Sequence, residues 1–170
     1  NEFRRQYQIP DNKKIITILP GSRHNEVGRL LPVFAEAARQ LLAQNPDFYF
    51  VIPTVRTVAS HVKAEAAKLN LPLLVVESQQ DRYNAFRASS AAIAASGTVA
   101  LELAICHIPH IIGYKVSPLT AFIAGKFLKI QFVNLSNIML GREVVPELLQ
   151  EQCIAGNIVR YINELLSHGE

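Results

Sequence analysis

A glycine, a serine and an arginine follow the first short apolar run of the sequence. The run is IITIL at 15–19, and after Pro20 come Gly21, Ser22 and Arg23. Glycine lets the backbone approach an anion closely, while the serine hydroxyl and the arginine fork can donate hydrogen bonds to it. These are the parts of a phosphate site, although a capped turn between a strand and a helix would use the same residues. Neither GxGxxG nor GxxxxGK[ST] is present, which excludes the classical dinucleotide and P-loop motifs.

A second loop of the same kind lies where AAIAA at 91–95 is followed by Ser96, Gly97 and Thr98. Two hydroxyls and the free amides of a helix start make another anion cradle. Glu102 comes four residues after Thr98, about 6 Å along a helix, at a depth that suits ribose hydroxyls when phosphates occupy the loop. The alternative is a helix cap followed by a solvated carboxylate. The apolar neighbours of Glu102 favour the ribose contact, because a carboxylate buried without a partner is costly.

The overall charge does not identify a partner by itself. The chain has 170 residues, with 17 Lys and Arg against 14 Asp and Glu, for a net charge of +3. The basic residues are scattered, so we expect no nucleic-acid partner, whereas small anions and an anionic membrane surface both fit. Two cysteines are too few for a disulfide framework and indicate thiols in a reducing compartment.

A cysteine and two histidines lie close together in the sequence and resemble part of a zinc site. Cys106, His107 and His110 have no second ligand cluster to complete it, and Cys153 is remote, so we expect no metal and no other cofactor. Lys115 follows the apolar run HIIGY at the loop edge of a predicted strand. The sequence leaves open whether Lys115 meets a phosphate or faces water.

Strand-like apolar runs alternate with segments of helical spacing along the chain. The predicted strands cover 15–19, 48–53, 73–76, 91–95 and 110–114, and the predicted helices cover 26–43, 58–69, 82–88, 99–106 and 119–130. The tail 146–170 is predicted to be helical, in two pieces broken near Ala155 and Gly156. This alternation predicts an α/β fold, a doubly wound, Rossmann-like parallel sheet covered on both faces, as a single domain over 1–170. Ligands of such sheets bind at the carboxyl ends of the strands, where both loops lie.

The segment from Pro118 to Ile130 is apolar but contains Lys126 and Lys129. Such a segment can lie on a membrane surface, but we expect a helix that packs on the sheet with its lysines in water. No run of about 18 uncharged apolar residues occurs, so no segment is predicted to span a bilayer. The first residues include neither an initiator methionine nor an export signal, and we expect the sequence to be part of a longer protein.

Four motifs follow one another along the chain: LPGSR after the first strand, SGTVALE at the start of a later helix, IIGYK, and NLSNIMLGREVVPELLQ at 134–150. In this order they resemble the carboxyl-terminal half of the lipid-A-disaccharide synthase family. The resemblance covers residues 3–158. Two positions depart from the family pattern. Ala100 stands where threonine is common, and Ser136 stands before Asn137 where proline is usual.

The resemblance implies one half of a GT-B glycosyltransferase, in which two Rossmann-like domains enclose the active site. The implied reaction joins UDP-2,3-diacylglucosamine to 2,3-diacylglucosamine 1-phosphate, giving the β-1,6-linked lipid A disaccharide 1-phosphate and UDP. This chain would supply the sugar-nucleotide site. The implied partners include the two lipid substrates and the protein's own amino-terminal domain. The resemblance also implies peripheral contact with the cytoplasmic side of the inner membrane of a Gram-negative bacterium, and a homodimer with a second copy.

The resemblance also implies roles for individual residues, through the motifs that match the family. Gly21, Ser22 and Arg23 would approach the diphosphate, Ser96, Gly97 and Thr98 the nucleotide phosphates, and Glu102 the ribose. Asn137 matches the family's loop asparagine, and Glu147 and Gln150 match its PE-x-LQ segment at the cleft. With Lys115, these residues make up the expected sugar-nucleotide site, in which Arg23 and Asn137 are the candidate catalytic residues.

The departure of UDP develops negative charge on its diphosphate. Since no carboxylate pair or histidine cluster is evident to hold a metal, the helix starts and Arg23 are the expected stabilisers of an inverting, metal-independent transfer. Two other functions stay open. One is another GT-B enzyme of UDP-sugars, such as an undecaprenyl-linked N-acetylglucosaminyl transferase or a UDP-sugar epimerase, against which the 134–150 segment argues. The other is a nucleotide-binding module without catalysis, whose melting temperature UDP would not shift if the loops serve only as caps.

Overall fold

The computed structural model describes residues 2–95, 97–127, 132 and 134–168. Within them, parallel strands form one sheet in the order β3-β2-β1-β4-β5-β6. The strands are β1 (Lys14–Leu19), β2 (Phe48–Pro53), β3 (Leu73–Val76), β4 (Ser89–Ala95), β5 (His110–Tyr114) and β6 (Glu147–Leu149). The helices are α1 (Glu2–Gln6), α2 (His24–Gln44), α3 (Ala59–Ala67), α4 (Gln79–Ala88), α5 (Val99–Ile105), α6 (Pro118–Phe127), α7 (Leu135–Leu140) and α8 (Ala155–Ser167).

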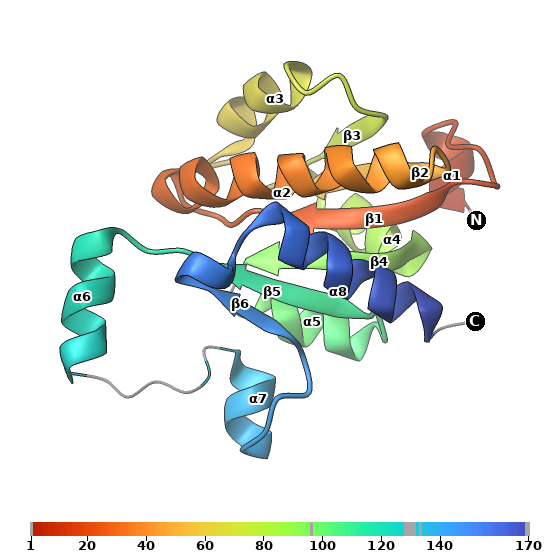
Figure 1. Ribbon diagram of the computed structural model, residues 1–170. Helices are drawn as coiled ribbons and strands as arrows, with labels where there is room; N and C mark the ends of the chain where they lie inside the picture. Colours follow the sequence, from red (N-terminus) through yellow and green to blue (C-terminus); the bar gives the residue numbers. More distant parts are fainter. Residues whose placement is uncertain (1, 96, 128–131, 133, 169–170) are drawn as a thin grey trace.

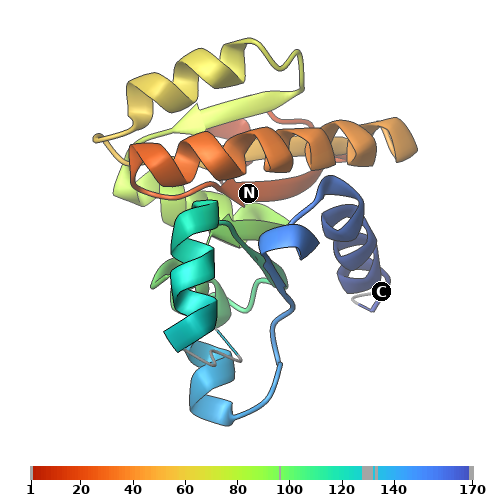
Figure 2. The same cartoon turned by 60° about the vertical axis from the view of Figure 1, so that its left-hand side comes forward.

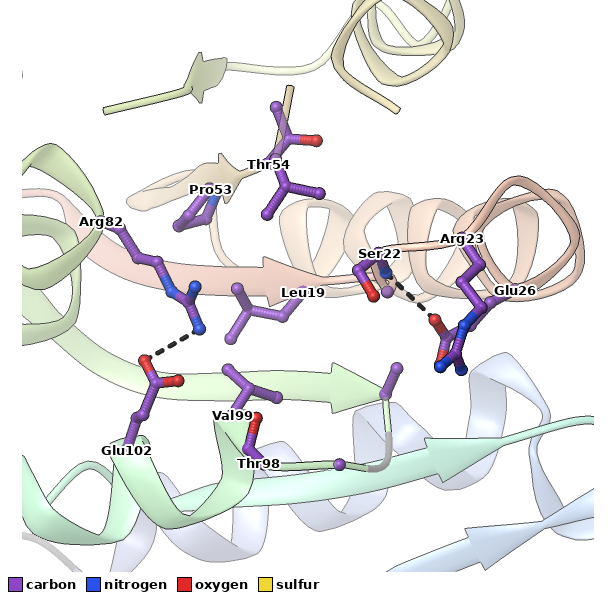
Figure 3. A pocket seen from close by; sticks show the side chains of 14 residues that line it. Leu19, Ser22, Arg23, Glu26, Pro53, Thr54, Arg82, Thr98, Val99 and Glu102 are labelled. Atoms are coloured by element: carbon purple, nitrogen blue, oxygen red, sulfur yellow. Dashed lines mark hydrogen bonds and ion pairs between the residues drawn. The ribbon is translucent and has the colours of Figure 1, made fainter. Parts of the chain in front are cut away.

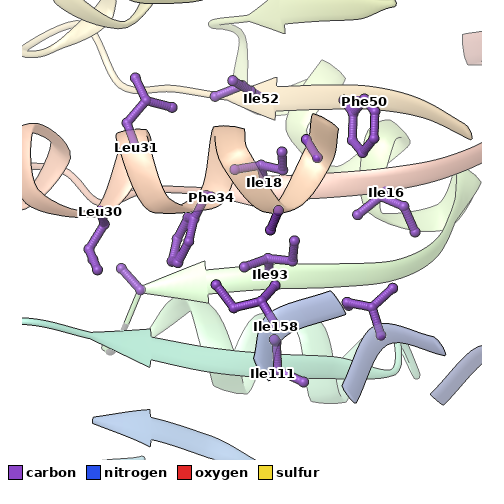
Figure 4. Packing of buried hydrophobic residues seen from close by; sticks show 14 of the residues in the cluster. Ile16, Ile18, Leu30, Leu31, Phe34, Phe50, Ile52, Ile93, Ile111 and Ile158 are labelled. Carbon is purple, nitrogen blue, oxygen red and sulfur yellow. The ribbon is translucent and has the colours of Figure 1, made fainter. Parts of the chain in front are cut away.

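Helices cover both faces of the sheet (Figure 1). On one face, Phe34 of α2 and Ile158 of α8 pack with Ile18, Ile93 and Ile111 of the central strands (Figure 4). The opposite face is covered by α1, α4 and α5, which pack in two smaller clusters. Side chains of β1 alternate between these layers because successive residues of a strand point to opposite faces. The predicted α/β, doubly wound architecture is confirmed.

The strand order reverses its direction between β1 and β4. From β1 the chain moves outward through β2 to β3, returns to β4 on the other side of β1, and continues outward through β5 to β6. Leu19 of β1 is in register with Ala94 of β4, so the two loops that follow these strands begin side by side. In open parallel sheets this switch point is where ligands bind, because the adjacent connections leave on opposite faces and open a crevice.

The prediction of a helical tail over 146–170 is wrong for the first part of that range. Residues Glu147–Leu149 form β6, which pairs with β5, and Gln150–Gln152 form a single 3-10 turn. Without β6, the backbone groups of β5 would face water on that side, and pairing also buries Leu148. The tertiary contact therefore overrides the local helical pattern. Ala155 and Gly156 begin α8 and do not break a helix.

Helix α6 lies beyond the carboxyl ends of the strands and over neither face of the sheet (Figures 1 and 2). Its side chains Leu119 and Phe122 are 69% and 64% exposed. The expectation that this helix packs on the sheet is therefore wrong, and positions 128–130 of the predicted helix lie outside the described residues. Among the described helices, none combines the length and the hydropathy needed to cross a bilayer.

Candidate functional site

A cavity of about 380 Å³ opens at the carboxyl ends of β1, β2 and β4, at the switch point of the sheet (Figure 3). Both predicted phosphate loops contribute to its wall, together with residues that follow β2 and lie on α4 and α5. The lining residues are Leu19, Gly21, Ser22, Arg23, Glu26, Pro53, Thr54, Val55, Arg82, Ala95, Gly97, Thr98, Val99 and Glu102. The structure thus brings together all the described residues of the two predicted phosphate loops and Glu102, whereas Ser96 lies outside the described residues.

The first loop depends on Gly21, whose φ of +118° is strained for any other residue. Arg23 is the N-cap residue of α2 and makes no side-chain cap, so the first turn of this long helix has free amides beside the cavity. The Ser22 amide is not free, because it donates to Oε2 of Glu26 at 3.0 Å. Glu26 was not among the predicted site residues. A phosphate in this loop would compete with its carboxylate for the Ser22 amide.

The second loop leads into α5. Gly97 has a φ of +131°, again outside the range that side chains favour, and Thr98 is the N-cap residue of α5 without a side-chain cap. The Thr98 hydroxyl is therefore not used as a cap. This geometry is consistent with the predicted anion cradle, and a cap made by the Thr98 side chain is absent from the described residues.

Glu102 forms an ion pair that the sequence did not predict. Its Oε2 lies 2.8 Å from an amino nitrogen of Arg82, and both side chains are about one quarter exposed. Figure 3 shows the two groups pointing toward each other across the cavity. The Arg82 guanidinium also lies 5.6 Å from the centre of the Phe86 ring. The carboxylate is thus held in place while its other oxygen can still accept hydrogen bonds.

The topology explains this pair. Arg82 is the fourth residue of α4, and Glu102 is the fourth residue of α5. Both helices cover the same face and start at the same edge of the sheet, so equivalent positions face each other. Arg82 could have been found from the sequence only by combining the strand order with the helix starts, because it is remote from both loops in the chain.

Thr54, at the end of β2, is a further polar residue that the sequence analysis missed. It is 7% exposed, and its hydroxyl has no hydrogen-bond partner among the described residues. A buried hydroxyl without a partner costs free energy unless a ligand or water satisfies it. Thr54 is therefore placed to bind a polar group of a ligand in the cavity.

Asn137 and Glu147 do not line this cavity. Asn137 is fully buried, and its amide donates to the Val145 carbonyl and to Oε1 of Glu147, both at 2.7 Å. Its carbonyl accepts the amides of Val144 and Val145. Every hydrogen-bonding position of this side chain is used inside the 134–147 loop. The geometry therefore favours a positioning role, and the predicted contact with a sugar nucleotide stays a prediction.

Gln150 and Lys115 belong to a neighbouring part of the same edge. The Gln150 side-chain oxygen accepts the backbone amide of Val116 at 2.8 Å, which fixes the loop after β5. Lys115 precedes this anchored residue and lines a separate cavity with Arg23. The PE-x-LQ segment thus shapes a loop at the cleft edge and does not enter the cavity between the two phosphate loops.

The histidine and cysteine cluster does not build a metal site in the described part of the chain, where no three His, Cys, Asp or Glu side chains group together. The ring nitrogen Nδ1 of His110 lies 2.8 Å from the Ile108 carbonyl and donates to it, and burial lowers the pKa of this ring. Burial likewise raises the pKa of the Cys153 thiol.

Solved structures with the same fold include two enzymes of nucleotide sugars. ADP-heptose lipopolysaccharide heptosyltransferase II of E. coli matches 99% of this chain with a TM-score of 0.71 and 14% identity, over 51% of its own length. UDP-GlcNAc 2-epimerase of Neisseria meningitidis, solved with UDP-GlcNAc, matches 99% of the chain with a TM-score of 0.60 and 17% identity, over 40% of its length. The chain thus has the Rossmann-like fold of GT-B glycosyltransferases.

Sequence comparison gives the particular family. The family model for lipid-A-disaccharide synthetase matches residues 1–170. The lipid-A-disaccharide synthase of Paramagnetospirillum magneticum is 44% identical over 167 residues, and that of Rhodospirillum centenum is 41% identical over 165. Each match covers 97% of this chain but only 43% and 41% of the respective relative. The chain belongs to the lipid-A-disaccharide synthetase family and spans about two fifths of the length of these curated relatives.

Proposed function

We propose that this chain provides the UDP-sugar site of a lipid-A-disaccharide synthase. The observation that carries the proposal is the cavity at the switch point, which combines two glycine-containing loops at helix starts with the fixed carboxylate of Glu102. Helix starts and an arginine suit a diphosphate, and a carboxylate suits the hydroxyls of a ribose. The family match supports UDP-2,3-diacylglucosamine as donor and 2,3-diacylglucosamine 1-phosphate as acceptor.

In this function Arg23 would stabilise the charge that develops on the departing UDP. Its side chain lines the cavity from the N-cap of α2, where the helix dipole adds to its positive charge. A cation and free amides placed at the leaving group are the kind of electrostatic stabilisation that accelerates such a departure. An inverting transfer that uses these groups and no metal ion is part of the proposal.

Acylated substrates require contact with lipid, and two helices outside the sheet layers carry exposed apolar side chains. On α6 these are Leu119, Phe122 and Ile123, and on α7 and after it they are Ile138, Met139, Leu140 and Val144. Large apolar side chains gathered outside a folded core are typical of interaction surfaces. They support peripheral contact with the cytoplasmic surface of the inner membrane as part of the proposal.

Arg23→Ala is expected to weaken UDP binding by at least about tenfold, because a charge-assisted contact to diphosphate is lost. Isothermal titration of the chain with UDP measures this. Arg87→Ala is the matched control, since Arg87 is an exposed arginine in the last turn of α4, away from the loop edge. If Arg23→Ala binds UDP as tightly as the control does, Arg23 does not take part in the site.

Glu102→Gln separates ribose recognition from loop structure. The substitution removes a charged acceptor and releases Arg82 from its ion pair, so the guanidinium becomes free for an anion. We expect UDP to bind about tenfold more weakly, while inorganic diphosphate binds as well as before or more tightly. Titration of the same variant with both ligands checks this. Equal losses for both ligands would show that Glu102 organises the loop and does not contact the ribose.

A further inference from the structure

A second cavity, of about 290 Å³, lies at the same edge of the sheet, between the first turns of α2 and the loop after β5. It is lined by Arg23, His24, Asn25, Glu26, Arg29, Tyr114, Lys115 and Val116. Arg23 and Glu26 line the cavity described above as well. The two cavities therefore share a wall, and groups bound in them would be neighbours.

The charge around this second cavity is unbalanced. Three of its side chains, Arg23, Arg29 and Lys115, are cations, and none of them forms an ion pair within the described residues. The single carboxylate, Glu26, already accepts the Ser22 amide. In the neighbouring cavity, by contrast, the cation Arg82 is paired with Glu102. Repulsion among unpaired cations around one cavity is relieved when an anion binds between them.

The backbone around the cavity also favours the binding of an anion. Helix α2 starts at its wall without a side-chain cap, so the positive end of a 21-residue helix faces this region. On the opposite wall the Gln150 side chain holds the Val116 amide, which fixes the backbone next to Lys115. The cations are thus carried by two anchored elements and not by free loops.

The position of the cavity indicates which kind of anion would bind in it. Helix α6 begins at Pro118, two residues after Val116, and exposes Leu119 and Phe122. An anion bound here would have apolar surface close by, which suits a phosphorylated lipid. Three cations favour a phosphate monoester, which carries close to two negative charges, over a phosphodiester, which carries one.

We propose that the second cavity binds the phosphate monoester of the acceptor, 2,3-diacylglucosamine 1-phosphate, beside the diphosphate of the donor. This inference rests on the proposed function, since it assigns the second substrate of the same reaction. Holding both phosphates on one wall would help to bring the acceptor hydroxyl to the donor sugar, because fixed geometry replaces a collision between two substrates. Arg29 and Lys115 are then acceptor-binding residues, and Arg23 lies between the two anions.

The test is a titration of the chain with glucose 1-phosphate in the presence of saturating UDP, followed by amide NMR. We expect shifts in residues 24–29 and 114–116, with UDP still bound. Arg29→Ala and Lys115→Ala should each weaken the binding of glucose 1-phosphate about fivefold to tenfold, and Arg29→Ala should change UDP affinity less than about twofold. Arg87→Ala should change neither. Arg29 is exposed on α2, where alanine favours the helix, so this variant is expected to fold.

Three results would overturn the inference. Competition between glucose 1-phosphate and UDP would mean one anion site and not two. Equal affinity for glycerophosphoethanolamine, a phosphodiester, would assign the cavity to a lipid headgroup. The absence of shifts at both elements, with UDP binding intact, would remove this subsite and leave the proposed function standing. Failure of UDP itself to bind would instead count against the proposed function.

Discussion

The 170-residue chain is expected to bind UDP and to form no disaccharide. Both anion loops and Glu102 are on this chain, so UDP should bind, although a site open on one side holds its ligand weakly. Transfer additionally requires that the acceptor hydroxyl be held against the anomeric carbon. Such positioning can supply about 7–11 kcal/mol of the barrier, which is several orders of magnitude in rate. The curated relatives contain more than twice the matched length, and we expect the opposing wall of the cleft to lie in that additional part.

The measurement uses purified chain with UDP-2,3-diacylglucosamine and the acceptor lipid in mixed micelles, and follows disaccharide and UDP. The control is the complete lipid-A-disaccharide synthase of Paramagnetospirillum magneticum under the same conditions. Turnover of the chain near the rate of the control would contradict the two-domain site. Absence of UDP binding at millimolar concentration, by ligand-observed NMR, would contradict the nucleotide site itself.

The sequence was sufficient to predict most of the fold because its periodicity is strong. The strand 48–53 and the long helix around Leu30 and Phe34 have the patterns of a buried strand and an amphipathic helix, and both occur where expected. The strand β6 was missed because only three residues form it. Its conformation is fixed by pairing with β5, which is a contact between distant parts of the chain, and local pattern does not contain that information.

The same distinction applies to the candidate site. The two loops were found because each has a local signature, a short apolar run followed by glycine and a hydroxyl residue. Arg82 and Thr54 have no such signature and line the cavity only because the strand order brings α4 and the end of β2 to the switch point. Asn137 shows the converse case. The resemblance singled it out as a site residue, and the structure shows its side chain buried and hydrogen-bonded within the 134–147 loop.

Asn137→Asp is expected to destabilise the chain by about 3–5 kcal/mol at neutral pH, because it removes two buried donors and places a carboxylate beside another one. The amide nitrogen that is lost lies 2.7 Å from Oε1 of Glu147 and donates also to the Val145 carbonyl. The substitution hardly changes the shape of the side chain, so packing is preserved. Chemical denaturation at pH 7.5 measures the free energy of unfolding, and Asn163→Asp is the matched control at an exposed position of α8.

The dependence of this defect on pH identifies its cause. Burial and the neighbouring carboxylate of Glu147 should raise the pKa of the carboxyl introduced at position 137 above its unfolded value of about 3.9. Protonation then favours the folded state, so the loss of stability is full above the raised pKa and shrinks as the pH falls through it toward about 4.

The free energy of unfolding measured at pH 5.0 and 7.5 should therefore show a smaller deficit at pH 5.0. Asn137→Ala, which introduces no carboxyl at this position, should show a deficit that changes less between the two pH values. If Asn137→Asp lowers the free energy of unfolding by less than about 1 kcal/mol at pH 7.5, as a substitution at an exposed site does, the 134–147 loop does not depend on this amide.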